Sequence, residues 1–279
     1  MLLLSGCFHE MHEMQPSEYG ENTPVGYLAT ALQWAQESDA ETPVHNLTFA
    51  LTGAGASFSR SFANEEEASL WLQQLPVGSY ELLVTANMSE ADGFVLSGLP
   101  VTKADPASED ILVTLKDGID DILQAWYSKI SVTISEDDLT IAEAELKGLL
   151  SNLSVVLTNV PSGTDVAISV GGMARCVDLT TERPGSEYYD DVPLGTRTEC
   201  FLFPTADGLD RCTVTLVVTA PSGKELTCVC DAPAMQSGVR YVLTLDYNTL
   251  RPFLHLDTCA IGPWEDGWSI SGAVTDPQE

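Results

Sequence analysis

The acidic, histidine-containing segment near the N-terminus is the first place where residue types and spacing could support chemistry. Residues 9–13 have the sequence HEMHE, which is close to the zinc-binding pattern HExxH. In that pattern the two histidines are four residues apart, so that one helix face presents both to the metal. His9 and His12 are three residues apart, in a stretch without helical periodicity. We therefore expect no metal site and no catalysis here.

Other patterns that carry enzyme chemistry are missing from the sequence. It contains no GxSxG nucleophile elbow, no GxxxxGK[ST] phosphate loop and no GxGxxG dinucleotide loop. His45 and His255 have no neighbouring nucleophile pattern. A glycosidase-type carboxylate pair stays open, because 41 acidic residues offer many pairings whose separation a sequence does not give. We predict a protein that is not an enzyme and has no catalytic residue, metal or cofactor.

The charge of the chain is strongly one-sided. Twelve Lys and Arg oppose 41 Asp and Glu, which gives a formal net charge of −29. Such a surface repels phosphate backbones, so we expect no nucleic acid as a partner. The acids are spread along the chain and do not follow the EF-hand calcium pattern, which indicates a solvated surface.

Cys7 is the candidate for a covalent modification. It ends the sequence Leu-Ser-Gly-Cys at residues 4–7, whose Leu4 is the last of three consecutive leucines, and this matches the bacterial lipobox cut by signal peptidase ahead of a lipidated cysteine. The basic n-region and long apolar run of a secretory signal are absent, so we interpret residues 1–22 as a truncated lipoprotein signal, cleaved before Cys7, and an acidic tether. Two or three acyl chains, such as palmitate, on Cys7 would hold the protein at a membrane.

The other six cysteines all lie in the second half of the chain: Cys176, Cys200, Cys212, Cys228, Cys230 and Cys259. An even number in an exported protein permits disulfides. If residues 221–223 (Pro-Ser-Gly) close a hairpin, Cys212 lies opposite Cys230 or its neighbour, and these two are candidates for a cross-strand disulfide. Buried thiols acting as small apolar side chains are the alternative. The paired CxxC spacing of a zinc site is missing.

The elements that position these residues are predicted to be β-strands. From residue 23 onward, apolar residues recur with a period of two between Pro- and Gly-containing turns. The clearest alternating segments are residues 47–52, 80–86, 111–115, 130–134, 153–157, 213–219 and 241–245. Many short strands at this spacing predict an all-β protein built from β-sandwiches with few short helices.

Two segments predict the short helices. Residues 119–130 carry apolar side chains at helical spacing, and residues 139–150 follow Ser135 and Asp138, placed like a helix N-cap and its partner. A weak similarity between residues 46–52 and 152–158 indicates two related units. We expect an N-terminal sandwich over residues 23–121 and a C-terminal, cysteine-containing sandwich over residues 122–279.

Several of these segments together resemble the fimbrillin superfamily. They are LTFALTG, LPVGSYELLVTAN, NLSVVLTNVPSG, ECFLFPTADGLDRCTVTLVV, SGVRYVLTLDYN and a final WEDG. Proteins of this superfamily are subunits of type V pili and related surface lipoproteins of Gram-negative gut and oral anaerobes. The resemblance implies two transthyretin-like Greek-key sandwiches in tandem, export as a lipoprotein to the cell outer membrane, exposure at the cell surface, and assembly by β-strand addition.

The resemblance also narrows the role within a fimbria. Stalk subunits of the superfamily lose their lipid and first strand to an arginine-specific protease. Here no Arg or Lys precedes Arg60, which follows the first clear strand. This favours an anchor or accessory subunit that keeps its lipid on Cys7 and binds stalk or other fimbrillin-like subunits.

The alternating C-terminal segment, residues 268–275, is a candidate for strand addition. It contains Trp268, Ile270 and Val274, and it could close the chain's own sheet or donate to a partner sheet, whose edge has unpaired N–H and C=O groups.

A glycan- or ligand-binding surface lipoprotein is the alternative function. In that case Tyr188, Tyr189, Trp264 and Trp268 would have to form an exposed, coplanar set on which sugar rings stack.

Overall fold

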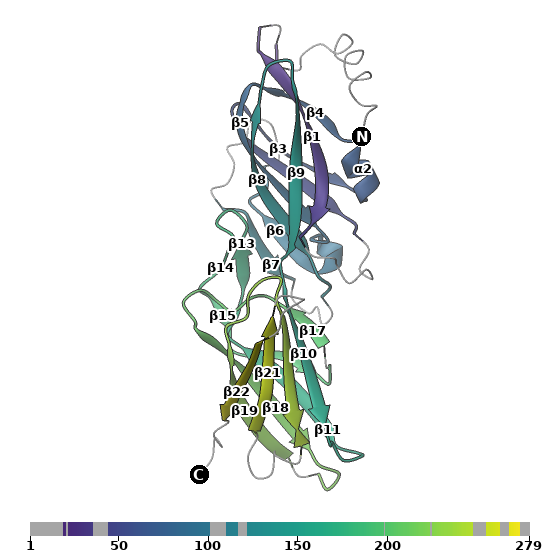
Figure 1. The fold of residues 1–279 in the computed structure, drawn as a ribbon, viewed down its shortest axis with the longest axis vertical. Coiled ribbons are helices and arrows are strands. Elements are labelled where there is room, and N and C mark those ends of the chain that lie inside the picture. Colours follow the sequence, from purple (N-terminus) through teal and green to yellow (C-terminus); the bar gives the residue numbers. More distant parts are fainter. Residues whose placement is uncertain are drawn as a thin grey trace.

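The computed structural model describes nearly all of the chain between Tyr19 and Asp246, and short strands beyond it. The described residues are 19–20, 22–35, 44–100, 110–116, 122–197, 199–223 and 225–247, together with the backbone of residues 255–262 and 268–273. In Figure 1 these residues form an elongated molecule in which one group of sheets lies above another along the long axis.

Almost every element is a β-strand, as the alternating pattern predicts. The strands are β1 (Val25–Trp34), β2 (Leu47–Gly53), β3 (Ala56–Phe62), β4 (Leu72–Pro76), β5 (Gly78–Ala86), β6 (Phe94–Ser97), β7 (Leu112–Leu115), β8 (Trp126–Ile134), β9 (Leu139–Gly148), β10 (Ser151–Thr158), β11 (Asp165–Gly171), β12 (Met173–Ala174), β13 (Cys176–Asp178), β14 (Arg183–Pro184), β15 (Tyr188–Tyr189), β16 (Val192–Gly195), β17 (Glu199–Leu202), β18 (Arg211–Thr219), β19 (Glu225–Pro233), β20 (Arg240–Asp246), β21 (His255–Gly262) and β22 (Trp268–Ala273). The helices described are the short α2 (Glu65–Ser69) and the 3-10 turn η1 (Glu90–Asp92).

The upper sandwich is one sheet folded on itself. Its strand order is β3-β2-β5-β8-β9-β1-β4, and β8 pairs with β9 only at Trp126 and Tyr127, so the sheet turns there and its two halves face each other. The core between them contains the buried side chains of Leu28, Phe49 and Tyr80. Because alternate residues of a strand point to opposite faces, one face of each half supplies this core.

The lower sandwich packs a five-stranded sheet against a four-stranded one. The orders are β17-β10-β20-β21-β22 and β16-β11-β18-β19. Their shared core joins residues such as Leu153 and Tyr241 from the first sheet to Val214 and Leu216 from the second. The long β18–β19 hairpin runs from the pair Arg211–Pro233 to the pair Thr219–Glu225, as residues 221–223 predict.

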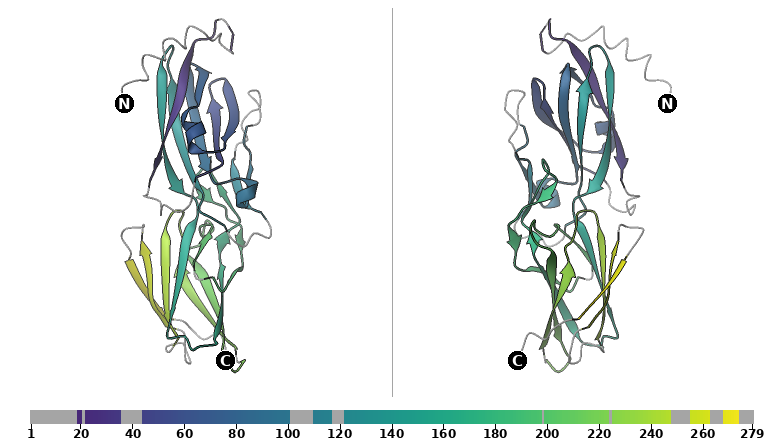
Figure 2. Two further views of the ribbon diagram at one scale, coloured as in Figure 1. Left: turned by 90° about the vertical axis from the view of Figure 1, so that its right-hand side faces the viewer. Right: turned by 60° about the vertical axis from the view of Figure 1, so that its left-hand side comes forward.

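A small third sheet connects the two sandwiches, and we call β6, β7, β13 and β14 the clasp sheet. Its strand order is β14-β13-β7-β6. The pairing of β7 with β13 therefore joins a strand that precedes β8 of the upper sandwich to a strand that follows β11 of the lower sandwich. It lies at mid-height on one side of the molecule (Figures 1 and 2). Its apolar face and the outward-facing Leu83 and Tyr127 of the upper sandwich belong to one buried cluster, together with Phe203 of the lower one. The clasp sheet therefore covers apolar side chains on the outer face of the upper sandwich, which is the face opposite its core.

The passage from the upper to the lower sandwich is fixed by a buried amide. The side chain of Gln124 accepts a hydrogen bond from Leu150 N at 3.0 Å and donates one to Leu150 O at 3.2 Å. Gly148 lies beside it, and a Cβ there would come within 2.8 Å of Gln124 Nε2 and 3.1 Å of Gly238 Cα. A larger residue at position 148 would therefore have to displace the Gln124 amide, which is bonded to Leu150, and shift the backbone at Gly238 slightly.

The two helix predictions are wrong. Residues 122–125 are not helical, Trp126 begins β8, and residues 139–148 form β9. In β9 the side chains of Ala142, Ala144 and Leu146 are buried while Glu143 and Glu145 are exposed, which is a period of two. The core of the upper sandwich overrides the local helix propensity of Ala and Glu in this segment.

The pairing of β8 and β9 favours a division of the chain that lies later than the expected boundary at residues 121/122. β8 pairs with β5, and β9 lies parallel to β1, from the pair Tyr27–Leu139 to Trp34–Leu146. Both strands therefore belong to the upper sandwich. We propose that the division between the two units lies at residues 149–150.

Removing a side chain from the cluster beneath the clasp sheet tests its contribution to stability. Leu179 is fully buried there, and its N–H donates to Ile111 O at 2.8 Å. We expect Leu179→Ala to lower the free energy of unfolding by about 2–5 kcal/mol, measured by urea unfolding followed by circular dichroism. Leu70→Ala is the control, because Leu70 is 78% exposed. Equal small effects of both changes would contradict this packing role.

A hydrogen-bonded group around Asp92 fixes the connection between β5 and β6. Asp92 accepts hydrogen bonds from Ser89 N at 2.9 Å and Ser89 Oγ at 2.6 Å, lies 2.6 Å from His45 Nε2, and accepts from Asn46 Nδ2 at 3.3 Å. Burial alone would raise the pKa of Asp92, but these hydrogen bonds outweigh it and lower the pKa below its usual range. The ionised carboxylate is therefore the form that the fold stabilises.

The lowered pKa of Asp92 predicts how the stability of the folded protein depends on pH. Asp92→Asn should lower the free energy of unfolding by about 1–2 kcal/mol at neutral pH. Because the folded pKa is depressed, the contribution is present above the unfolded pKa of about 3.9 and is lost as pH falls through the folded value. Thermal unfolding of both proteins between about pH 2 and 7 measures this. A difference that persists undiminished at the acid end would contradict it, and Asp210→Asn at the surface is the control.

Candidate functional site

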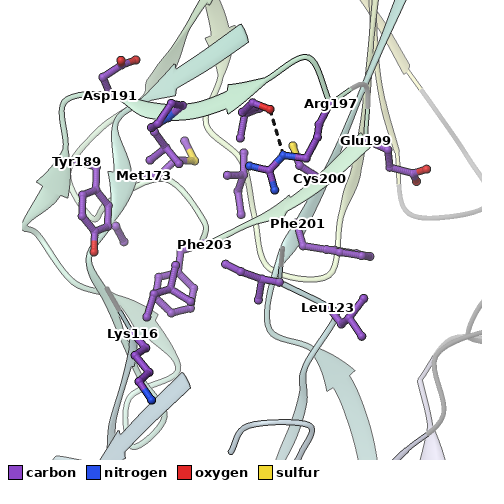
Figure 3. A pocket seen from close by; sticks show the side chains of 17 residues that line it. Lys116, Leu123, Met173, Tyr189, Asp191, Arg197, Glu199, Cys200, Phe201 and Phe203 are labelled. Carbon is purple, nitrogen blue, oxygen red and sulfur yellow. Dashed lines mark hydrogen bonds between the residues drawn. The ribbon is translucent and has the colours of Figure 1, made fainter. Parts of the chain in front are cut away.

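A groove that the described residues form at the junction of the two sandwiches, which we call the waist groove, is a candidate site. It has a volume of about 610 Å³, within the range of about 300–1,000 Å³ that is typical of ligand pockets. Its lining comes from the end of β7, from residues 122–123, and from β12, β15, β16 and β17 with the residues that follow them (Figure 3). Segments far apart in the sequence therefore meet at this site.

The floor of the waist groove is apolar. Met173, Leu194 and Leu202 belong to the core of the lower sandwich, and Phe203 belongs to the cluster beneath the clasp sheet. All four side chains are nearly fully buried. The groove therefore reaches down to the point where two hydrophobic clusters meet.

Charged side chains occupy the rim, and they are balanced. Lys116 and Arg197 carry positive charge, and Asp191 and Glu199 carry negative charge. Figure 3 shows Lys116 and Arg197 on either side of Phe203. In a chain with a net charge of −29, a rim whose charges cancel is locally much less acidic than the rest of the surface.

The turn between β16 and β17 positions Arg197. Its backbone N–H donates to Leu194 O at 3.2 Å, and its side-chain Nε donates to the same carbonyl at 3.0 Å (Figure 3). Gly195 has a φ of +62°, a left-handed conformation that glycine adopts without strain. On the other side, Glu199 accepts a hydrogen bond from Asn152 Nδ2 at 3.2 Å and lies 3.8 Å from Arg240.

The groove holds no activated nucleophile. Cys200 lines it, but burial raises the pKa of its thiol to about 12, and the nearby positive charge of Arg197 does not offset this. A thiol with so high a pKa is almost entirely protonated at neutral pH and reacts slowly. Within the described ranges, no three His, Cys, Asp or Glu side chains are arranged to hold a metal ion. Cys200 is therefore not an activated nucleophile in this groove.

The predicted site residues lie elsewhere, and part of them is outside the described residues. The structure does not describe residues 1–18, which include Cys7, and it does not describe Trp264 or Val274. Trp268 and Ile270 lie in β22, which pairs antiparallel with β21 of the same chain, from the pair His255–Ala273 to the pair Ile261–Trp268. In this pairing β22 is the outer strand of the five-stranded sheet.

The tyrosine pair proposed for glycan stacking does not form a platform. Tyr188 and Tyr189 are consecutive in β15, so their rings point to opposite sides of the strand. Tyr188 is 43% exposed, whereas Tyr189 lines the waist groove and has the guanidinium of Arg175 4.8 Å from its ring centroid. The described aromatic residues therefore give no support to a flat sugar-binding surface here.

Cys212 and Cys230 lie on neighbouring strands but are not directly opposite. Cys212 faces Ala232, and Cys230 faces Val214. Both occur as buried thiols, with Sγ of Cys212 3.4 Å from Pro233 O and Sγ of Cys230 3.3 Å from Val214 O. Diagonal neighbours in a sheet are typically about 7–8 Å apart, beyond the usual Cα separation in a disulfide. This arrangement favours the alternative in which the thiols act as apolar core side chains.

Sequence reasoning did not identify the waist groove. Residues 200–203 fall within one of the segments that carry the fimbrillin resemblance, but nothing in the sequence indicates that they meet Lys116 or Met173. The groove depends on the pairing of β7 with β13, and these strands are too short to show a periodic pattern.

Among the described helices none is long and apolar enough to cross a membrane.

The described residues form an elongated all-β protein built from sandwiches, with a groove where the sandwiches meet. A family model for the fimbrillin-A associated anchor proteins Mfa1 and Mfa2 matches residues 29–241, and the chain belongs to this family. No curated protein sequence shows significant similarity to the chain.

Solved structures share the fold at low sequence identity. A candidate adhesin of Bacteroides thetaiotaomicron has a TM-score of 0.58 at 13% identity, covering 90% of this chain and 99% of that one. A candidate polysaccharide-binding protein of the same organism has a TM-score of 0.56 at 13% identity, covering 88% and 98%. The fimbrial anchor protein Mfa2 of Porphyromonas gingivalis has a TM-score of 0.52 at 13% identity, covering 88% and 99%. At these identities the likeness establishes the fold alone.

Thiol reactivity tests the state of the cysteines in the lower core. We expect Cys212 and Cys230 to resist alkylation in the native protein and to react once it is unfolded without a reductant, because both are nearly fully buried thiols. Peptide mapping by mass spectrometry after each treatment measures this. A peptide pair linked through Cys212 and Cys230 in the unreduced protein would instead establish the disulfide. Cys176 is the comparison: it is partly exposed, so it should react before the two buried thiols, but slowly, because burial and the nearby carboxylates of Glu187 and Asp178 raise the pKa of its thiol.

Proposed function

We propose that this protein is an anchor or accessory subunit of a fimbria, held at the surface of the outer membrane by lipid on Cys7. The match of the anchor-protein family over residues 29–241 carries the proposal. The family is one of fimbrial anchor proteins and no catalytic family is indicated, which agrees with a site built for binding.

The position of Arg60 supports an anchor or accessory role over a stalk role. Arg60 lies within β3, where it pairs with Phe49 of β2. Cleavage after Arg60 would separate β1 and β2 from the chain, and these strands supply Leu28 and Phe49 to the core of the upper sandwich. β1 also pairs on both sides, with β9 and β4. Removing it would expose the core instead of opening one clean edge.

Strand addition is the mode of assembly that we propose. The outer strands of the sheets have one row of N–H and C=O groups that a partner strand can satisfy. β22 is such a strand, paired with β21 on one side. We propose that β22 closes the lower sandwich in the isolated protein and that its outer edge, or the strand itself, engages a fimbrillin-like partner.

The lipid anchor has a direct test. Cys7→Ser should move the protein from the membrane fraction to the soluble fraction in the cell that produces it, because acyl chains supply the membrane affinity. Cys176→Ser is the matched control and should stay in the membrane fraction. Immunoblots of the fractions and mass spectrometry of the native N-terminus measure both. Unchanged membrane association of Cys7→Ser would contradict acyl anchoring at this residue.

The donor role of β22 is tested separately. If β22 contributes to assembly, deleting residues 268–279 should reduce the fimbrillin-like subunits that co-purify with the protein by about tenfold or more. Circular dichroism of the shortened protein shows whether the sandwich still folds. A folded, shortened protein that retains its partners would eliminate the donor role and leave β22 as a closing strand.

A further inference from the structure

We infer that Arg60 keeps β3, an outer strand of the upper sandwich, from pairing with a second copy of this chain. β3 is an edge that the proposed function does not use, and this role of Arg60 is independent of β22 and of lipid on Cys7. Three features support it: the face of β3 on which Arg60 lies, the surroundings of its guanidinium group, and the open side of the sheet.

Arg60 is a charged residue on the core face of β3. The sequence of β3, Ala-Ser-Phe-Ser-Arg-Ser-Phe, alternates strictly, so its serines lie on the opposite face. Directly opposite residues of an antiparallel pair share a face, and Arg60 is opposite Phe49, which is buried in the core. The other residues on this face, Ala56, Phe58 and Phe62, lie in that core or pack against it. An arginine therefore stands where the pattern calls for an apolar side chain.

The guanidinium group of Arg60 has an aromatic neighbour but no carboxylate. Its Cζ lies 5.6 Å from the centroid of the Phe62 ring, and the residue is exposed. Among the described residues none forms an ion pair with Arg60, whereas Lys147 lies 2.9 Å from a carboxylate. Glu67 lines the same hollow as Arg60, but its carboxylate accepts a hydrogen bond from Ala63 N at 3.0 Å. Water is therefore what solvates this charge.

The side of the upper sandwich at which β3 lies is open and apolar. β3 and β4 are the two outer strands of the folded sheet, and in the described part of the chain β3 pairs only with β2. A hollow of about 530 Å³ beside β3 is lined by the core residues Phe62 and Trp71 and by Leu70, which is 78% exposed. An outer strand has a row of N–H and C=O groups that the same strand of a second copy could satisfy. Such an edge beside apolar side chains favours self-association.

Arg60 opposes this self-association because pairing would bury its charge. Neighbouring strands of a sheet are about 4.8 Å apart, so a second β3 would place its core-face side chains beside the guanidinium group. The group would lose water without gaining a carboxylate, and an uncompensated buried charge is unfavourable. In a two-fold pair this happens in both copies. Inward-pointing charges on outer strands protect the edges of natural sheets in this way.

Removing the charge tests this role in the full chain. All proteins carry Cys7→Ser, so that acyl chains do not associate them. We expect Arg60→Leu to dimerise or assemble further, with a dissociation constant at least about tenfold lower than that of the protein with Arg60, because leucine completes the apolar face of β3. Sedimentation velocity over a range of concentrations measures this, and circular dichroism reports the fold. Arg60→Met repeats the test with an unbranched side chain.

Two matched variants separate the charge at this edge from other effects. Arg60→Lys keeps a cation at the position and should stay monomeric. Arg175→Leu removes the same charge from another exposed arginine, whose guanidinium lies 4.8 Å from the centroid of the Tyr189 ring outside any outer strand, and it should also stay monomeric. In the associated Arg60→Leu protein, amide hydrogen exchange in β3 should be slower than in the diluted protein.

Several outcomes would overturn this role of Arg60. These are folded Arg60→Leu and Arg60→Met proteins that remain monomeric, association of Arg60→Lys or Arg175→Leu equal to that of Arg60→Leu, or association that leaves hydrogen exchange in β3 unchanged. Loss of the fold in both Arg60→Leu and Arg60→Met would overturn it too, because Arg60 would then be needed for the core itself. Membrane retention and co-purified fimbrillin-like subunits judge the proposed function independently of these results.

Discussion

The pairing of β7 with β13 is the constraint on which the arrangement of the molecule depends. Three residue pairs join the strands, Cys176–Thr114, Val177–Val113 and Asp178–Leu112, across a wide separation in sequence. The clasp sheet that results covers apolar side chains which the upper sandwich presents on its outer face. Without this cover those side chains would lie in water, and the described contacts that join the two units would be reduced to those around residues 148–150, which include the hydrogen bonds between Gln124 and Leu150. The hydrophobic effect at this one sheet therefore holds the two units in a fixed relation.

The fixed relation suits the role that we propose. An anchor transmits force between a fibre and a membrane, and a single chain crossing between two units would bend under load. Here polar contacts reinforce the apolar cover: Lys129 Nζ donates to Thr180 O at 2.8 Å, and Lys147 lies 2.9 Å from Glu182. The same joint shapes the waist groove, because Phe203 belongs to the cluster beneath the clasp sheet and also to the groove floor. Phe203 thus contributes both to the joint and to the floor of the waist groove.

Much of the fold could be predicted from the sequence, because strands with one buried face carry a period of two. The segments around Phe49, Leu82 and Val214 are strands for this reason, and the turn at residues 221–223 gives the β18–β19 hairpin. The helix predictions failed where alanine and glutamate alternate in β9, since local propensity and tertiary burial disagree there. The clasp sheet and the waist groove lay beyond prediction, because β13 and β7 are short and their pairing is a long-range contact. The fimbrillin resemblance correctly indicated the family without indicating either feature.

Differential scanning calorimetry of the folded protein tests the central claim most directly, that the clasp sheet makes the two sandwiches one mechanical unit. The account predicts a single transition whose calorimetric and van't Hoff enthalpies agree, because neither sandwich can unfold without exposing the shared cluster. Two separate transitions, one for each sandwich, would contradict it.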